Sequence, residues 1–223
     1  MKNFKNFRAF VAESEAEAHT VRPRSIHQLQ DIIRDTMKKE GPKCDLNFID
    51  VSLIDDMSNL FSASGLTEFN GDISKWNVSK VWRMYGMFNK SKFNGDISKW
   101  NVSNVTDMDN MFSRSLFNGD ISKWNVSKVK TMNYMFLDSK FKGDISKWNV
   151  SNVKEMAWMF CRSVFNGNIS KWNVSKVENM MDMFADSKFK GDISKWNVSK
   201  VDNMRDMFKN SPLESKKPDW YND

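Results

Sequence analysis

Large apolar residues recur along most of this chain at one fixed interval, which is the interval from Phe69 to Phe93. One copy gives the full pattern, with apolar side chains at Phe93, Ile97, Trp100, Val102, Val105, Met108, Met111 and Phe112. Around Trp100 and Val102, apolar and polar residues alternate with the period of a short strand. From Val105 onward, the spacing of three, three and one places the side chains on one face of a short helix, with Ser103 as its N-cap. Each copy is therefore predicted to form a turn, a short strand and a short helix.

Six such copies follow one another, and they begin at Phe69, Phe93, Phe117, Phe141, Phe165 and Phe189. A glycine follows two residues after each of these phenylalanines, and Gly95 in the second copy is expected to take a positive φ in a tight turn. The apolar side chains of one copy cannot offset the entropy of ordering its whole backbone, so each copy needs its neighbours. The predicted fold class is an α/β solenoid, a stack of coils that each contain a short strand and a short helix.

A capping helix and a divergent coil are predicted before the six repeats, which span residues 69–212. Residues 25–43 have the pattern of an amphipathic helix, with Ser25 as its N-cap, and this helix would cover the open end of the stack. Residues 44–68 form a divergent coil zero, because the repeat's spacing is kept by Leu46, Ile49, Val51, Ile54, Met57, Leu60 and Phe61.

The two ends of the chain depart further from the repeat. Residues 213–223 keep its phase through Leu213 and Trp220, and they are expected to form a degenerate C-terminal cap coil. Residues 1–24 read as an N-terminal leader or linker.

The repeated phrase "DISxWNVS…MxxMF" closely resembles the BspA-like repeats of bacterial surface proteins and mycoplasma lipoproteins. Its pattern Ile-x-x-Trp-x-Val-x-x-Asn/Lys-Val is similar to the strand segment of a leucine-rich repeat. The resemblance covers at least residues 46–212. It implies a leucine-rich-repeat-like solenoid with an interaction role, and it implies no chemistry.

The N-terminus "MKNFKNFRAFVAE" is similar to the leader of T-even-type phage internal head proteins. Met1, Lys2, Phe4 and Phe7 match that leader, and cleavage would fall between Glu13 and Ser14. The resemblance implies a virion or ejected head protein. The alternative is an amphipathic helix that docks on the body through the aromatic residues of this stretch.

Composition favours no enzyme or cofactor class. The two cysteines, Cys44 and Cys161, and the two histidines, His19 and His27, have no metal-ligand or catalytic spacing, so neither a metal nor a cofactor is expected. No apolar run approaches the roughly 20 residues of a membrane span, and no secretory signal is seen, so the expected location is intracellular, or a virion if the protein is phage-encoded. The net charge of +6 is unevenly spread, but basic residues are less concentrated than in a typical nucleic-acid binder, which makes nucleic acid an unlikely partner.

The copies differ mainly at positions expected to face away from the core. Tyr134 and Trp158 occupy the same position in adjacent copies and should lie side by side on this outer face. Aromatic and basic residues are frequent anchors of protein interfaces. The candidate partner-binding residues are therefore Trp82, Arg83, Tyr85, Tyr134, Trp158 and Met181.

Two charged columns are common to nearly all copies. The lysine row comprises Lys75, Lys99, Lys123, Lys147, Lys171 and Lys195, and it is a candidate anion-binding row. The aspartate column comprises Asp72, Asp96, Asp120, Asp144 and Asp192, and it is interrupted by Asn168. These aspartates could bind a row of calcium ions or cap turns by accepting backbone hydrogen bonds, and turn capping is favoured.

Three functions remain open at this stage. The first is a non-enzymatic scaffold that binds another protein through its variable outer face. The others are a phage head protein with a cleavable leader, and an adhesin-like surface module that binds anions or glycans. The sequence leaves the oligomeric state open, with a monomer favoured.

Overall fold

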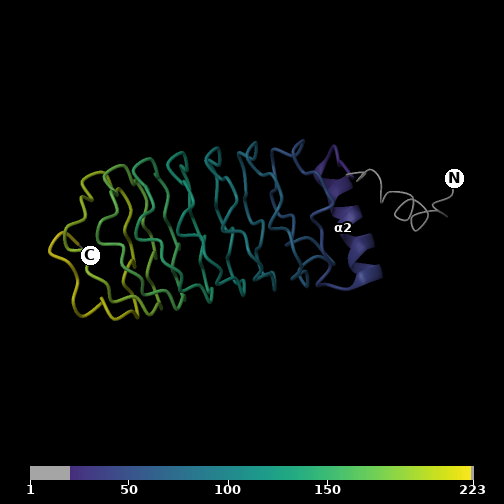
Figure 1. Cartoon of the computed structure of the whole chain (residues 1–223). Coiled ribbons are helices and arrows are strands. Elements are labelled where there is room, and N and C mark those ends of the chain that lie inside the picture. Colours follow the sequence, from purple (N-terminus) through teal and green to yellow (C-terminus); the bar gives the residue numbers. More distant parts are fainter. Residues whose placement is uncertain (1–20, 222–223) are drawn as a thin grey trace.

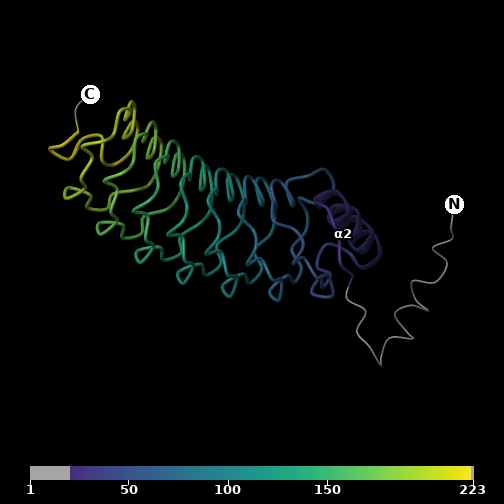
Figure 2. The same cartoon turned by 90° about the horizontal axis from the view of Figure 1, so that it is seen from above.

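In the computed structural model, residues 21–221 are described, and they form a row of coils stacked along one axis (Figure 1, Figure 2). The predicted leader and its cleavage site at Glu13 and Ser14 lie outside these residues. Adjacent coils are joined by isolated parallel bridges at one position of the repeat, from Asp56 to Arg83 and then through Asp107, Thr131, Glu155, Asn179 and Asn203. The interval that recurs in the sequence is thus the period of the stack.

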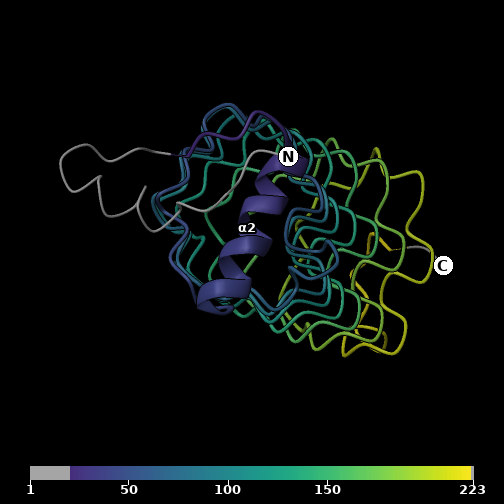
Figure 3. The ribbon, with the colours of Figure 1, turned by 90° about the vertical axis from the view of Figure 1, so that its right-hand side faces the viewer.

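Helix α2 (Ile26–Glu40) lies across the N-terminal end of the stack (Figure 3). Its N-cap is Ser25, whose hydroxyl accepts a hydrogen bond from the Gln28 N–H at 3.2 Å, as the sequence predicted. Its apolar side is in the core, because Leu29 and Ile33 are fully buried. The helix therefore covers apolar surface that the first coil would otherwise expose.

The core consists of columns of identical side chains that run along the stack. Phe112 stacks on the equivalent Phe136 of the next coil, with ring centroids 5.8 Å apart, and on Phe117 at 4.3 Å. The seven apolar residues that identified coil zero are all buried as well. Each ring is therefore packed between equivalent rings of its neighbours, and the core has no break between coil zero and the last repeat.

A ladder of tryptophans ties each coil to the preceding one. The Trp124 indole Nε1 donates to the Ile97 carbonyl at 3.1 Å, and the same bond recurs at each tryptophan of the later repeats. Trp220 repeats it with Ile193, also at 3.1 Å, and Leu213 is buried. The segment after the sixth repeat thus continues the contacts of the repeats.

The short helix predicted from Val105 is replaced by turns. The N–H groups of Asn110 and Phe112 do not close helical bonds but donate to the next coil, at Asn133 O (2.8 Å) and Met135 O (2.9 Å). Asn110 also has a φ of 58°, which an α-helix cannot contain. The spacing of the apolar residues could not distinguish a short helix from consecutive turns, because both place the same side chains in the core.

The predicted short strand also differs from the structure. Trp100 and Val102 lie in consecutive turns, where the Trp100 N–H donates to Ile97 O and the Val105 N–H donates to Val102 O. The bridge between coils forms further along the copy, at Asp107. Helix α2 is the only α-helix among residues 21–221, and no helix in that range is long and apolar enough to cross a membrane.

Gly95 is not in the conformation predicted for it. Within the described range, the glycines with positive φ are Gly41, Gly65 and Gly86. A Cβ at Gly95 would instead lie 2.7 Å from the Phe93 Cε2 atom and 3.0 Å from the Gly71 carbonyl oxygen. Glycine is required here because the backbone passes directly over a core ring.

Candidate interaction site

One position of the turn segment takes a left-handed backbone in coil after coil. It is held by Gly86 (φ 58°), Asn110 (58°), Tyr134 (58°), Trp158 (60°), Asp182 (52°) and Asp206 (54°). Glycine, asparagine and aspartate are the residues that tolerate such a backbone best, whereas a bulky side chain there is unusual. The two aromatic residues are therefore the exceptions in this column.

Tyr134 and Trp158 are stacked on each other, as their equivalent positions predicted. Their ring centroids lie 5.9 Å apart with an angle of 19° between the planes. Both residues are half-buried rather than fully exposed, and the Trp158 Nε1 atom is buried without a hydrogen-bond partner in the described part of the chain. The pair is therefore partly exposed, with the indole N–H of Trp158 turned away from solvent.

The other predicted partner-binding residues do not join this pair in one cluster. Arg83 lies over the Tyr85 ring at 5.2 Å and forms an ion pair with Asp107 at 2.8 Å. Trp82 is 45% exposed, which is large for a tryptophan. The Trp82–Arg83–Tyr85 segment thus forms a second group, two coils before Tyr134.

Met181 sits in the column that also contains Tyr85, one position away from the aromatic pair. It is half-buried, its N–H donates to Asn179 Oδ1 at 3.1 Å, and its carbonyl accepts from the Trp158 N–H at 2.8 Å. Its place beside the pair is therefore fixed by backbone contacts with the Trp158 coil.

Sequence reasoning missed a partly buried carboxylate in the same turn segment. Asp109 accepts hydrogen bonds from the Thr131 hydroxyl and from the Asn133 N–H, the latter at 2.6 Å. Burial raises the pKa of Asp109, and the nearby charge of Asp107 adds to this effect. The signal available in the sequence was the close spacing of Asp107 and Asp109, because no other repeat has acids at both of these positions.

Asp109→Asn is expected to raise the free energy of unfolding at pH 7. A carboxyl whose pKa is raised by folding contributes stability below its unfolded pKa, and loses it as pH rises through the folded value. Asparagine keeps an acceptor for Thr131 and Asn133 but carries no buried charge. Urea denaturation at pH 7 and pH 3 measures this, and the gap over wild type should shrink at pH 3.

Asp107→Asn is the matched control for that change, because Asp107 is paired with Arg83. It should lower the free energy of unfolding, or leave it unaltered, at pH 7. An Asp109→Asn variant that is less stable than wild type at pH 7 would contradict the account of Asp109.

The aspartate column caps turns, as the sequence favoured. The Ser98 N–H donates to Asp96 Oδ1 at 2.9 Å, and this hydrogen bond lowers the pKa of the Asp96 carboxyl. The same bond recurs in the other coils, including the fifth repeat, where Ser170 donates to the Asn168 amide oxygen. The structure shows no group of three potential metal-binding side chains among residues 21–221.

The lysine row consists of side chains at equivalent positions of adjacent coils, on the outer surface of the stack. Lys147 and Lys171 are the two members that line a hollow, which is described below. The nearest aspartate of the column contributes attraction to its own lysine, as at Asp96 and Lys99. The row is therefore a line of cations partly balanced by the aspartate column.

The two cysteines are buried single thiols. Burial raises the pKa of the Cys161 thiol to about 11, and burial together with Glu40 raises that of Cys44. Since the thiolate is the reactive form, neither side chain is set up as a nucleophile.

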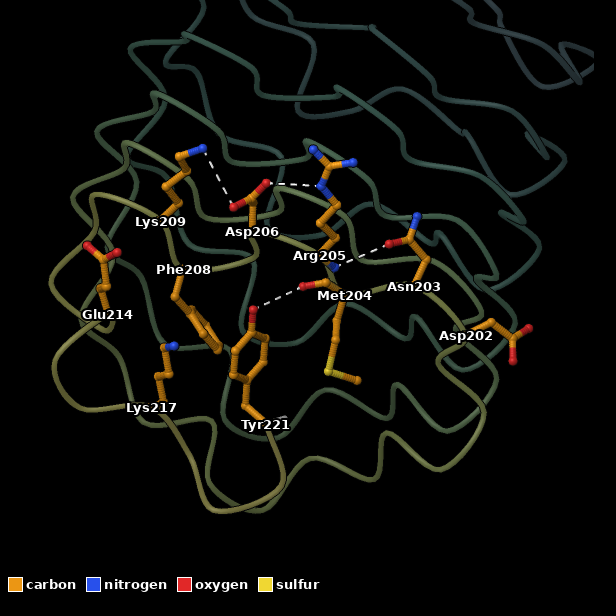
Figure 4. Close-up of a pocket in the computed structure, with 10 residues that line it drawn as sticks. All are labelled: Asp202, Asn203, Met204, Arg205, Asp206, Phe208, Lys209, Glu214, Lys217 and Tyr221. Carbon is orange, nitrogen blue, oxygen red and sulfur yellow. Dashed lines mark hydrogen bonds and ion pairs between the residues drawn. The ribbon is translucent and has the colours of Figure 1, made fainter. Parts of the chain in front are cut away.

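A larger hollow of about 520 Å³ lies at the C-terminal end of the stack (Figure 4). One of its acids, Asp206, pairs with Arg205 at 3.2 Å and with Lys209 at 3.6 Å. The Tyr221 hydroxyl donates to the Met204 carbonyl at 3.3 Å across its floor. The balanced charges of this hollow favour no particular ligand.

Comparison with known proteins places the chain in a family. The family model described as "Mycoplasma protein of unknown function, DUF285" matches residues 29–141 and 138–220. No curated protein and no solved structure matches the chain. Two consecutive matches agree with a protein built from repeats, and the BspA-like assignment stays a prediction. Because the two matches together span most of the sequence, this protein belongs to the DUF285 family of mycoplasma proteins of unknown function.

Proposed function

We propose that this protein is a non-enzymatic scaffold, a leucine-rich-repeat-like solenoid, that binds another protein through the outer face of its turn segments. The observation that supports this most is the stacked pair of Tyr134 and Trp158 at left-handed positions. Tryptophan and tyrosine are enriched among the residues that dominate binding energy in protein interfaces.

The backbone conformation at Tyr134 and Trp158 indicates that these aromatic residues do not serve stability. A non-glycine residue in a sparsely populated backbone region costs about 1–3 kcal/mol, and such residues concentrate at functional sites. A stacked aromatic pair returns about 0.5–1.5 kcal/mol beyond its buried area. The pair carries the backbone cost twice, so stacking offsets only part of it, and Asn110 shows that the scaffold accepts a small residue at this position.

The Tyr134→Asn/Trp158→Asn double variant tests the proposal with the residue that the chain itself uses at Asn110. Its free energy of unfolding should stay within roughly 1 kcal/mol of wild type, as for most surface changes. Loss of each ring should weaken binding to the partner by about 2 kcal/mol or more. The measurement is affinity capture from extracts of the source cells with both tagged proteins, followed by titration of the captured protein.

A double variant in the lysine row, Lys99→Ser/Lys123→Ser, is the matched control. It should capture the partner as wild type does. If this control loses the partner while the aromatic variant keeps it, the result supports the anion- or glycan-binding alternative and contradicts the outer-face proposal.

A further inference from the structure

A hollow of about 180 Å³ lies between two adjacent coils on the side of the lysine row. It is lined by Ser146 and Lys147 of one coil and by Asn168 and Lys171 of the next. The two lysines hold the same position in adjacent repeats. The hollow is therefore lined by two lysine side chains and two neutral polar side chains.

No carboxylate lines this hollow, and the reason is a single residue. Asn168 stands where the other repeats have Asp72, Asp96, Asp120, Asp144 and Asp192. In those coils the aspartate attracts the lysine three positions later, as Asp120 does Lys123. Lys171 has no such aspartate in its own coil. Lys147 retains Asp144, which lies outside the lining.

The Asn168 side chain, which lines the hollow, uses its oxygen within its own turn. Its Oδ1 atom accepts from both the N–H and the hydroxyl of Ser170, at 3.0 and 2.8 Å. The NH₂ group is left to donate, since the structure gives it no acceptor in the described part of the chain. Two ammonium groups and this NH₂ are donors only, and the Ser146 hydroxyl can also donate.

We propose that this hollow binds one oxyanion group, a phosphate or a sulfate, between Lys147 and Lys171. Ammonium-to-oxyanion hydrogen bonds are charge-assisted and are the strong kind available to such a group. An aspartate in place of Asn168 would point a negative oxygen at the same space. The site is independent of the aromatic pair, and it gives the anion-binding alternative one particular location.

The test is a titration of the full-length chain with inorganic phosphate, and separately with sulfate, at low ionic strength. Amide NMR signals of Ser146, Asn168 and Lys171 should shift before those of equivalent residues in other coils. Asn168→Asp keeps the turn, because aspartate accepts from Ser170 as its equivalents do. This variant should bind at least about fivefold more weakly, because it adds a unit of like charge within a few ångströms of the anion.

A gain-of-site variant sharpens the test. Asp120→Asn should create the same donor set between Lys99 and Lys123, and a second group of shifts should appear there. The Tyr134→Asn/Trp158→Asn variant should bind phosphate as wild type does, so failure of the outer-face proposal would not affect this result.

The outcomes separate the site from general attraction to the lysine row. Asn168→Asp binding as tightly as wild type, or equal shifts along the whole row, would overturn the proposal. Absence of any shift with phosphate and sulfate would overturn both this site and the anion-binding alternative. If the site is present, a sulfated disaccharide can be compared with inorganic sulfate. Tighter binding of the disaccharide, together with weaker disaccharide binding by the Asn168→Asp variant, identifies a glycan as the carrier of the anion. Equal affinity identifies the free ion.

Discussion

Replacing Trp124 by alanine is expected to lower the free energy of unfolding by about 3–5 kcal/mol, as truncation of a large aromatic in a packed core does. Trp124 is 4% exposed, its ring lies 6.2 Å from that of Phe112, and its Nε1 donates to the Ile97 carbonyl at 3.1 Å. Alanine leaves a cavity in the middle of the stack and removes one of the two hydrogen bonds that the Ile97 carbonyl accepts, the other coming from the Trp100 N–H. Urea denaturation followed by circular dichroism measures the change, and a single transition is expected because each coil depends on its neighbours.

Trp124→Phe separates the two contributions. It retains most of the aromatic bulk but removes the indole hydrogen bond, so it should cost less than alanine, with about 0.5–1.5 kcal/mol for that lost bond. A Trp124→Ala protein as stable as wild type would mean that the tryptophan ladder does not hold the coils together.

Gly167→Ala is expected to cost about 1–3 kcal/mol, the usual range for forcing an extra methyl into a packed core. A Cβ at this position would lie 2.7 Å from Phe165 Cζ and 2.8 Å from its Cε2. Phe165 is fully buried and stacked between Phe141 and Phe189, so its ring cannot swing away. Thermal unfolding of the variant beside wild type measures the cost.

The same substitution in a Phe165→Leu background is the control. The nearest atoms that a Cβ would meet at Gly167 all belong to the Phe165 ring. Removing that ring should therefore make Gly167→Ala much less costly, and the double-mutant cycle should show a clear departure from additivity. Equal costs in both backgrounds would assign the glycine to a backbone requirement instead.

The buried positions of this protein could be predicted from its sequence. The recurrence of Phe, Ile, Trp, Val and Met at a fixed interval marked the core residues, and the structure buries them except for Val198, Val201 and Met204 of the last repeat, which are half-buried. The N-cap of helix α2 at Ser25 and the turn caps of the aspartate column were also predictable. All of these depend on which residue types stand at which spacing, and spacing is a property of the sequence.

The backbone between those positions could not be predicted in the same way. The spacing of Val105, Met108 and Met111 fits a helical face and a wound pair of turns equally well, because both return a side chain to the core every three or four positions. Acceptors in the next coil decided the outcome: the Met108 N–H donates to Thr131 O at 3.1 Å, across the stack. No local pattern records that a neighbour's carbonyls will be there.

Both candidate sites show the same division. The sequence determined that Tyr134 and Trp158 are equivalent and adjacent, and that Asn168 interrupts a column of aspartates. Only the tertiary structure decided that the two rings stack on a left-handed backbone, and that Asn168 and two lysines line one hollow. The reason is physical: a repeat fixes which residues share a column, whereas backbone conformation and the space between columns are set by hydrogen bonds and packing from the adjacent coils.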